Sequence, residues 1–304
     1  MTDEFKAIGI AAGDDGVALE QSALGGPVLR LTNDSGTALV ALQGAQLFGW
    51  TPAGHDPVIW LSPVERLANP PANPKPVRGG TPVCWPWFAA HPTDASKPAH
   101  GFVRTRLWNI DRAERSDSQL RVTFTTATTA PDKTLWPGQA ALEITVTLGE
   151  ELTLDFTTHN TGADAFSLTQ ALHTYFAVSD ISNVTVEGFD GQTYLDKLDA
   201  NTRKQQAGPI TFAAEVDRVY DVHEGWAAIT DRGLKRRIEI AKSGSRSSVV
   251  WNPWIEKCNR LGDMGPDGYR GMVCVETCNA GADIVHILPR ASHTLSATYK
   301  VVRL

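Results

Sequence analysis

Cysteine and long apolar runs are both scarce in this chain of 304 residues. Its four cysteines form neither a C-x-x-C pair nor a framework dense enough for a secreted disulfide scaffold, so small core residues are the better interpretation for all four. No stretch of about 18 apolar residues could span a membrane. The opening MTDEFKAIGIAAGDDG lacks the basic and apolar regions of a secretory signal, and a cytoplasmic location is expected.

An excess of basic residues is also missing. The 28 lysines and arginines are outnumbered by 34 acidic residues, which gives a formal net charge of -6. Nucleic acids and anionic membranes are bound through clustered basic residues, so neither is expected as the main partner. An anionic small molecule is compatible with this charge because it needs only a few arginines placed locally. The chain is expected to act as a monomer.

Motifs of several common enzyme classes are absent. There is no G-x-S-x-G, no P-loop, no G-x-G-x-x-G and no H-E-x-x-H, which removes the usual signatures of serine hydrolases, nucleoside triphosphatases, dinucleotide-binding enzymes and zinc proteases. The eight histidines are scattered along the chain, without a grouping typical of a metal site. Neither a metal nor any other cofactor is expected.

Strand-like segments recur from end to end of the chain. They show period-two alternation of apolar residues or enrichment in β-branched residues, whereas no segment offers a long apolar stripe of helical period with proper caps. The clearest hairpin joins 141–148 to 152–158 through Gly149, Glu150 and Glu151. Further strands are expected at 28–32, 101–110, 120–126, 184–188, 237–241, 248–251, 272–277 and 294–301. The pattern predicts an all-β, antiparallel fold.

Loops rich in proline and glycine separate these segments, at 62–77, 91–99, 201–209 and 259–271. None is long or biased enough to act as a flexible linker, and composition does not shift across any of them. A single domain over residues 1–304 is therefore expected. Because loops of this length in a compact β protein are usually functional, we expect them to form the rim of a binding cleft.

Two ionisable side chains stand within strand-like apolar sequence. In MVCVET, Val273 and Val275 are expected to face one way, and Cys274 and Glu276 the other. In LTQALHTYFAV, His173 shares a face with the residues two before and two after it. Each could reach into a cleft. Taken alone, such a glutamate is more often solvated, and such a histidine more often lies partly buried and bonded to a neighbouring carbonyl.

Other candidate residues stand beside glycine or turn-like sequence. Arg78 opens RGGTPVCWPWF, and His100 and Arg104 bracket HGFVR. Two guanidiniums there could converge on an oxyanion, although a surface salt bridge explains either arginine alone. Asp217 in VDRVY could accept hydrogen bonds from hydroxyls or be an ordinary turn acid. The tryptophans at 85, 87, 251 and 254 could present flat faces to a sugar ring, but large aromatics most often serve a core.

Taken together, these residues resemble the aldose 1-epimerase superfamily, and within it the hexose-6-phosphate mutarotases (glucose-6-phosphate 1-epimerases). The matching segments occur in the order of that family, from about residue 35 to 300. They are LQGAQLFGW (42–50), IWLS (59–62), RGGTPVCWPWF (78–88), PAHGFVRTRLW (98–108), ALHTYFAVSDI (171–181), VEGFDGQTYLDK (186–197), DRVY (217–220), GDMGPDGY (262–269) and VCVET (273–277). An ordered set of this kind is much more specific than any one motif.

The resemblance implies an antiparallel β-supersandwich of the galactose-mutarotase type, with a sugar cleft on its concave face. It implies that His173 is the acid at the ring oxygen and that Glu276 is the base at the anomeric hydroxyl. His100 would be a second cleft histidine, and Asp217 would hold a sugar hydroxyl. All four side chains are thus expected in one cleft.

The two arginines are the residues expected to make the protein selective for phosphorylated sugars. By resemblance, Arg78 and Arg104 take the phosphate of an aldohexose 6-phosphate, chiefly glucose 6-phosphate. Some relatives have glutamine where this chain has Ala99, and no role is assigned to that position or to the stretch 251–264. An epimerase of unphosphorylated aldoses would not require the arginine pair. A noncatalytic sugar-binding β-sandwich would not require the acid and the base.

The chemistry of anomer exchange demands the same equipment. A base must remove the proton of the C1 hydroxyl while an acid protonates the ring oxygen; rotation about C1–C2 and closure with the roles reversed then gives the other anomer. No metal or redox cofactor is needed. Because both groups serve one anomeric centre, the polar atoms of His173 and Glu276 are expected within about 8 Å of each other, given hydrogen-bond reaches of roughly 3 Å.

Overall fold

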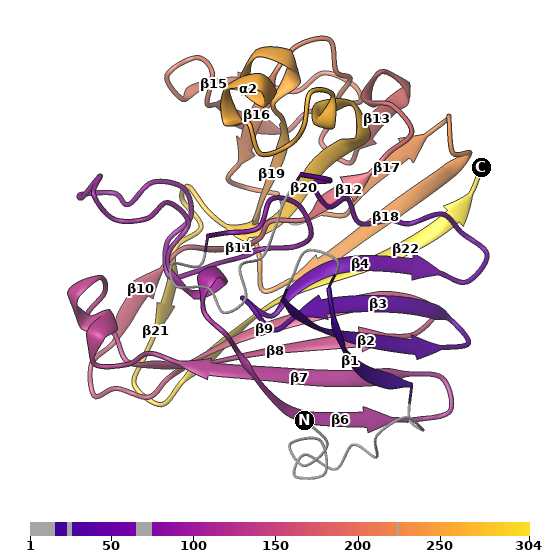
Figure 1. Ribbon diagram of the computed structural model, residues 1–304. Coiled ribbons are helices and arrows are strands. Elements are labelled where there is room, and N and C mark those ends of the chain that lie inside the picture. Colours follow the sequence, from indigo (N-terminus) through magenta and orange to yellow (C-terminus); the bar gives the residue numbers. More distant parts are fainter. Residues whose placement is uncertain (1–15, 23–25, 65–74, 224) are drawn as a thin grey trace.

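The computed structural model describes residues 16–22, 26–64, 75–223 and 225–304. Its strands form two eight-stranded sheets, one four-stranded sheet and one two-stranded pair, and the paired strands within each sheet are antiparallel (Figure 1). The expected all-β, antiparallel architecture is confirmed. Of the proline-rich loop expected at 62–77, residues 65–74 lie outside the described part of the chain.

The longest strands build one eight-stranded sheet, in the order β13-β17-β18-β22-β9-β8-β7-β6. The expected hairpin is at its centre, where Leu148 pairs with Leu152 and Gly149 N–H donates to the Glu151 carbonyl at 3.0 Å. The strands are β6 (Asn109–Arg115), β7 (Leu120–Ala127), β8 (Ala140–Leu148), β9 (Leu152–Asn160), β13 (Val184–Glu187), β17 (Ala227–Asp231), β18 (Arg236–Ser243) and β22 (Ser292–Arg303).

The second eight-stranded sheet carries most of the candidate residues. Its order is β15-β14-β16-β19-β20-β11-β5, with β12 also paired to β20. The central strand β20 therefore has β19 on one side and β11 and β12 on the other. The strands are β5 (Val83–Cys84), β11 (Gln170–Leu172), β12 (Tyr175–Ala177), β14 (Thr193–Asp196), β15 (Thr202–Gln205), β16 (Val216–Tyr220), β19 (Ser247–Asn252) and β20 (Met272–Asn279).

The remaining strands form two smaller sheets. The first strands of the described chain make a meander, β1 (Val17–Gln21), β2 (Pro27–Asn33), β3 (Gly36–Ala41) and β4 (Gln46–Pro52), in which β2 and β3 pack against β7 and β8. The strands β10 (Phe166–Leu168) and β21 (Val285–Ile287) pair with each other. The four-stranded sheet thus packs as one layer of a sandwich on the eight-stranded sheet that contains β7 and β8.

Three elements differ from the sequence-based expectation, and one of them is strand β15 (Thr202–Gln205), which lies in the segment 201–209 expected to be a loop. The strand expected at 101–110 is wrong: a 3-10 turn, η1 (Val103–Thr105), interrupts it, and only its last two residues belong to β6. The backbone there bonds to loops, since Phe102 N–H donates to the Trp85 carbonyl and Trp108 N–H to the Leu42 carbonyl. An eight-residue helix, α2 (Trp254–Leu261), was not expected. The other short turns are η2 (Pro131–Thr134), η3 (Ile181–Asn183) and η4 (Gly268–Gly271).

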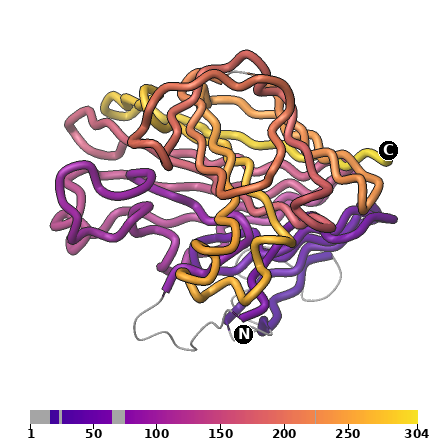
Figure 2. The backbone as a smooth tube through the Cα atoms, turned by 90° about the horizontal axis from the view of Figure 1, so that it is seen from above, coloured from indigo at the N-terminus to yellow at the C-terminus, as the bar shows by residue number. Residues whose placement is uncertain are grey.

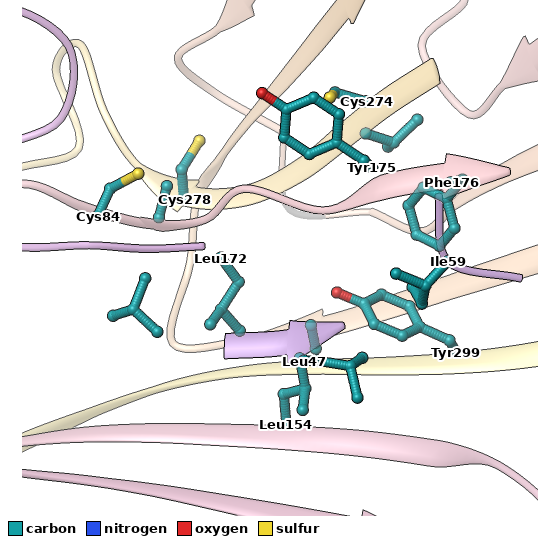
Figure 3. Close-up of a cluster of buried hydrophobic side chains, with 14 of the residues drawn as sticks. Leu47, Ile59, Cys84, Leu154, Leu172, Tyr175, Phe176, Cys274, Cys278 and Tyr299 are labelled. Atoms are coloured by element: carbon teal, nitrogen blue, oxygen red, sulfur yellow. The ribbon is translucent and has the colours of Figure 1, made fainter. Parts of the chain in front are cut away.

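The core between the sheets explains the alternation around His173. Thr174 and Phe176 both contact Tyr299 of β22, through a 2.7 Å hydroxyl bond and an edge-to-face ring contact. In Figure 3, Leu172 and Phe176 point toward Leu154 and Tyr299, whereas Tyr175 lies on the opposite side of the strand with Cys274. One face of this segment therefore serves the core, and the other, which carries His173 and Tyr175, faces away from it. All four cysteines are free and buried, as expected for small core residues.

The segment after β19 is brought back against the segment that opens with Arg78. Figure 2 shows the orange chain around α2 passing beside the purple chain that precedes residue 100. Ser62 Oγ donates to the Asp263 carbonyl at 2.6 Å, and Arg78 bonds the Asp263 carboxylate. Among the described residues, no helix is long and apolar enough to cross a membrane.

Candidate active site

A cavity of about 900 Å³ opens on the sheet that contains β20. Side chains reach it from β20, β16, the turn between β11 and β12, and the segments on either side of β5. Its lining includes all six residues singled out from the sequence: Arg78, His100, Arg104, His173, Asp217 and Glu276. The structure therefore brings the six side chains together around one cavity.

Glu276 lies in the middle of β20, opposite Val249 of β19, and only 2% of its surface is exposed. The solvated alternative is therefore wrong. Burial raises the pKa of its carboxyl well above the ordinary value, and the negative charge of Asp217 adds to this rise. Its Oε2 has no hydrogen-bond partner among the described residues. Glu276 is thus a buried carboxyl that tends to hold a proton.

His173 lies in the short turn between β11 and β12, where its backbone N–H donates to the Pro82 carbonyl at 3.0 Å. Its Nδ1 is buried and has no hydrogen-bond partner in the described part of the chain, so the alternative of a carbonyl-bonded ring is wrong. Burial lowers the pKa of the imidazole well below its ordinary value, and His100, Arg78 and Arg104 lower it further. These surroundings therefore favour the neutral ring.

The two groups meet directly. His173 Nε2 lies 3.4 Å from Glu276 Oε1, well within the separation expected from the chemistry. The opposite directions of their pKa changes place the proton of the pair on the carboxyl and leave the imidazole neutral. A neutral acid beside a neutral base, in a cavity open to a ligand, is an arrangement suited to moving protons.

His100 provides a second imidazole, 5.6 Å from that of His173 between ring centres. Its backbone has a φ of 62°, and its Nδ1 accepts a hydrogen bond from Ala89 N–H at 3.3 Å. Burial and the charges of Arg104 and Arg78 lower its pKa to about 3. Because Nδ1 accepts, the neutral ring carries its proton on Nε2, which is then a hydrogen-bond donor.

The two arginines differ in how far they are already bonded. Arg78 binds both oxygens of Asp263 through Nε and Nη2, at 2.9 to 3.1 Å, and donates from Nη1 to the Tyr175 hydroxyl at 2.9 Å. Arg104 donates from Nη2 to the Ala99 carbonyl at 2.8 Å. Its Nε is buried without a partner among the described residues, and burial lowers its pKa.

Asp217 lies in β16, paired across the ladder with Trp251 of β19. Lys257 of α2 is 3.4 Å from its carboxylate and 2.6 Å from that of Glu215. Burial raises the pKa of Asp217, and Lys257 opposes that rise. The alternative of an ordinary turn acid is therefore wrong, since Asp217 is a strand residue within the cavity.

Several lining residues were not assigned a role from the sequence. Lys257 and Asp263 come from 251–264, which brings a helix and its following loop to the cavity. Tyr175 could have been found, because it shares the face of His173 two residues on. Lys75 and Lys197 add two exposed cations to the lining. Among the described residues, no group of three or more His, Cys, Asp or Glu side chains could hold a metal ion.

The chain is similar to known proteins over most of its length. Residues 27–300 match the aldose 1-epimerase family. An Escherichia coli protein named "Putative glucose-6-phosphate 1-epimerase" is 37% identical over 244 residues, which is 80% of each chain. A protein of the same name from Cenchrus ciliaris is 36% identical over 79% of this chain and 74% of its own.

The solved structures extend the likeness to the fold. One described as a "putative mutarotase" from Salmonella typhimurium has a TM-score of 0.87 at 29% identity and covers 100% of both chains. A galactose mutarotase-like protein from Clostridium acetobutylicum has a TM-score of 0.73 at 13% identity, over 95% of this chain and 98% of its own. The expected galactose-mutarotase-like fold is confirmed.

Proposed function

The chain belongs to the aldose 1-epimerase family, and from that premise we propose that it interconverts the α and β anomers of an aldohexose 6-phosphate, chiefly glucose 6-phosphate. Aldose epimerase activity makes it an isomerase. The observation that carries the phosphate proposal is Arg104, whose guanidinium lines the cavity without an acidic partner among the described residues. A partly buried cation that lacks a counter-charge is costly unless a ligand supplies one.

The available donors indicate how the phosphate is held. A guanidinium has five N–H donors, and the Nε and Nη1 of Arg104 have no partner among the described residues. Arg78, in contrast, already uses all three of its nitrogens on Asp263 and Tyr175. Arg104 is therefore the main phosphate ligand, and Arg78 contributes its remaining N–H groups. Bidentate bonds of this kind suit the oxygens of a phosphoryl group.

Ring opening is assigned to the buried pair. His173 protonates the ring oxygen and Glu276 removes the proton of the C1 hydroxyl, which leaves an open-chain aldehyde, a neutral imidazole and a protonated carboxyl. Rotation about C1–C2 exposes the other face of the aldehyde. Closure reverses both transfers, so the pair returns to its starting protonation and no proton is gained or lost.

The substrate phosphate supports this distribution of protons. The positive charges of Arg78 and Arg104 contribute to the lowered pKa of His173. A bound phosphate dianion offsets those charges, which favours transfer of the shared proton from Glu276 to His173. The acid required for ring opening is then formed when the substrate is in place. A neutral sugar lacks this effect.

The remaining residues orient the sugar. Asp217 accepts hydrogen bonds from ring hydroxyls, with Lys257 holding its carboxylate. His100 donates from Nε2, since its Nδ1 is occupied by Ala89 N–H. The Trp251 ring lies beside the pair, 6.1 Å from that of His173, and offers an apolar wall to the sugar.

Replacement of Arg104 tests the phosphate proposal. Arg104→Ala is expected to raise the KM for glucose 6-phosphate about tenfold or more, at about 1.4 kcal/mol per decade, with little effect on residual activity toward glucose. Arg104→Lys should restore part of the loss, because lysine keeps the charge without the planar fork. Anomerisation of both sugars by all variants is the measurement.

A matched control is Arg112→Ala, since Arg112 is an exposed arginine of β6 that pairs with Asp111 and Glu143. Its removal should leave both activities unchanged, because exposed pairs contribute about 0 to 1 kcal/mol. An equal loss on glucose and glucose 6-phosphate in Arg104→Ala would contradict phosphate recognition. It would mean that the arginine supports the cavity in general.

A further inference from the structure

We propose that Tyr175 is a positioning residue: its ring holds the imidazole of His173 in the orientation for proton transfer, and its hydroxyl links that imidazole to Arg78. The proposal rests on the proposed mutarotase mechanism and assigns a role to a further residue of the same cavity. The observation behind it is that His173 is oriented by ring packing and not by a hydrogen bond from Nδ1 to another described residue.

A histidine that transfers protons is usually oriented by a hydrogen bond to its second ring nitrogen. His173 lacks this device, because its buried Nδ1 has no partner on another described residue, and the backbone group that acts on its ring belongs to His173 itself. Its Nε2 faces Glu276 at 3.4 Å. Packing must therefore set the orientation of the ring. The closest aromatic neighbour is Tyr175, stacked at 4.9 Å between ring centres with an interplanar angle of 10°.

Tyr175 is itself firmly placed, with 2% of its surface exposed. Its N–H donates to the Gly80 carbonyl, and its own carbonyl accepts from Trp60 N–H, both at 2.9 Å. The Trp60 ring stacks on it at 5.8 Å, and the Trp251 edge meets it at 5.9 Å. The ring of Tyr175 is thus a rigid surface against which His173 lies.

The hydroxyl of Tyr175 connects this surface to the arginine. It accepts a hydrogen bond from Arg78 Nη1 at 2.9 Å, while Asp263 holds the other side of the guanidinium. Arg78 and His173 are therefore separated by one tyrosine side chain. A ligand that binds Arg78 therefore contacts a guanidinium that is hydrogen-bonded to Tyr175, the residue on which His173 stacks.

Two substitutions separate the ring from the hydroxyl. Tyr175→Leu removes the stacked ring and is expected to lower kcat by about 10- to 100-fold on both glucose 6-phosphate and glucose, because a misplaced proton-transfer group loses most of its contribution. The KM for glucose should change by less than about threefold. Tyr175→Phe keeps the ring and should restore kcat to within about threefold of wild type, with a raised KM for glucose 6-phosphate alone.

The matched control is Phe176→Leu, on the other face of the same strand. Phe176 is fully buried against Tyr299, so this change removes a comparable ring and lowers the melting temperature without touching His173. Its kcat should remain at the wild-type value. A loss of kcat in Phe176→Leu equal to that in Tyr175→Leu would mean that general loosening of the strand explains both, and would overturn the proposal.

A readout independent of turnover is the pKa of His173, followed by NMR of its ring nitrogens in the unliganded protein and assigned with His173→Ala. The charged or titratable groups that contact it or shift its pKa are Glu276 from β20, His100, Arg104, Arg78 and Tyr175, and Asp217 from β16 lines the same cavity. In Tyr175→Leu the ring is released toward the cavity, and its pKa should rise toward the ordinary value. In Tyr175→Phe it should stay low.

The two proposals fail in different ways. If wild-type protein anomerises neither sugar, the proposed function is wrong, and the NMR titration still tests the placement of His173. If wild-type protein is active while Tyr175→Leu keeps both its kcat and a low His173 pKa, the mechanism stands and the role of Tyr175 is wrong.

Discussion

Glu276 and His173 are buried polar side chains that lack part of their usual hydrogen bonding. Glu276 Oε2 and His173 Nδ1 have no partner among the described residues, although buried polar atoms are normally bonded. The protein therefore bears an energetic cost at these positions. Such costs are typical of sites where a ligand completes the bonding, which agrees with a sugar that presents its ring oxygen and C1 hydroxyl to the pair.

The first residue-scale prediction concerns turnover. Glu276→Gln and His173→Ala should each lower kcat for glucose 6-phosphate by about 10² or more while the protein stays folded, because each removes a positioned proton-transfer group. The double variant should be only modestly worse, since the two groups act as a unit. Steady-state anomerisation rates together with circular dichroism provide the measurement. Near wild-type turnover in either single variant would assign its role to another residue.

The second concerns stability and pH. The pKa of Glu276 is raised in the folded state above the ordinary value of 4.5, so its contribution to folding is greatest below pH 4.5 and declines as pH rises toward the folded pKa. Glutamine does not titrate. Glu276→Gln should therefore gain in melting temperature relative to wild type as pH increases from 5 to 8, by roughly 2 to 4 °C for each 1 kcal/mol.

The comparison isolates Glu276, because the lowered pKa of His173 affects both proteins in the same direction. That effect reduces stability as pH falls below 6.5. Thermal unfolding across this pH range, with wild type and Glu276→Gln side by side, is the measurement. A difference in melting temperature that is constant with pH, or that shrinks as pH rises, would contradict a raised pKa.

At the scale of elements, the regular strands were predictable because alternation and β-branched residues mark them directly. The hairpin of β8 and β9 and the central strand β20 agree with the sequence-based expectation to within about two residues. The alternation also predicted which face of β20 carries Glu276. It could not predict that this face is enclosed, because enclosure depends on segments that are distant in sequence.

The irregular elements near the site were less visible. The segment 101–110 alternates like a strand, yet its backbone bonds to loops, and no local pattern reports such partners. The apolar stripe of helix α2 has only three residues, Trp254, Cys258 and Leu261, which is too short to predict a helix, although Gly262 with a φ of 72° marks its end. Lys257 and Asp263 were missed with it. Arg104 was found from its motif. That it has no acidic partner among the described residues depends on the fold and could not be predicted from the sequence.

Gly101 provides an element-scale prediction, since it turns the chain between His100 and η1. Its φ is 71°, and an added Cβ would collide with the Trp85 carbonyl. Gly101→Ala should destabilise the fold by more than about 2 kcal/mol, from the left-handed backbone and the displaced Trp85 carbonyl together, and should raise the KM for glucose 6-phosphate by moving Arg104.

Gly191→Ala is the matched control for that change. Gly191 has a φ of 74° but an added Cβ would meet nothing within 4 Å, so only the conformational cost of about 1 kcal/mol applies. Urea unfolding and KM of both variants decide the matter. Equal destabilisation by the two substitutions, with an unchanged KM, would mean that the turn at Gly101 does not position the phosphate ligand.

At the scale of the whole molecule, the charge of the cavity differs in sign from that of the chain. The chain has an excess of acidic residues, whereas five lysine or arginine and three acidic side chains of the described residues line the cavity, and one of those acids is Glu276 with its raised pKa. Lysine and arginine side chains thus surround the His173–Glu276 pair in a protein that is acidic as a whole. This distribution favours a small anionic substrate over a neutral one.

The most direct test of the central claim is the rate of exchange between α and β anomers, followed by proton NMR with glucose 6-phosphate, glucose and galactose under identical conditions. We expect wild-type protein to accelerate exchange of glucose 6-phosphate, with a kcat/KM at least about tenfold above that for either free sugar, equivalent to about 1.4 kcal/mol from the phosphate. Equal or faster exchange of glucose or galactose, or no acceleration with glucose 6-phosphate, would contradict it.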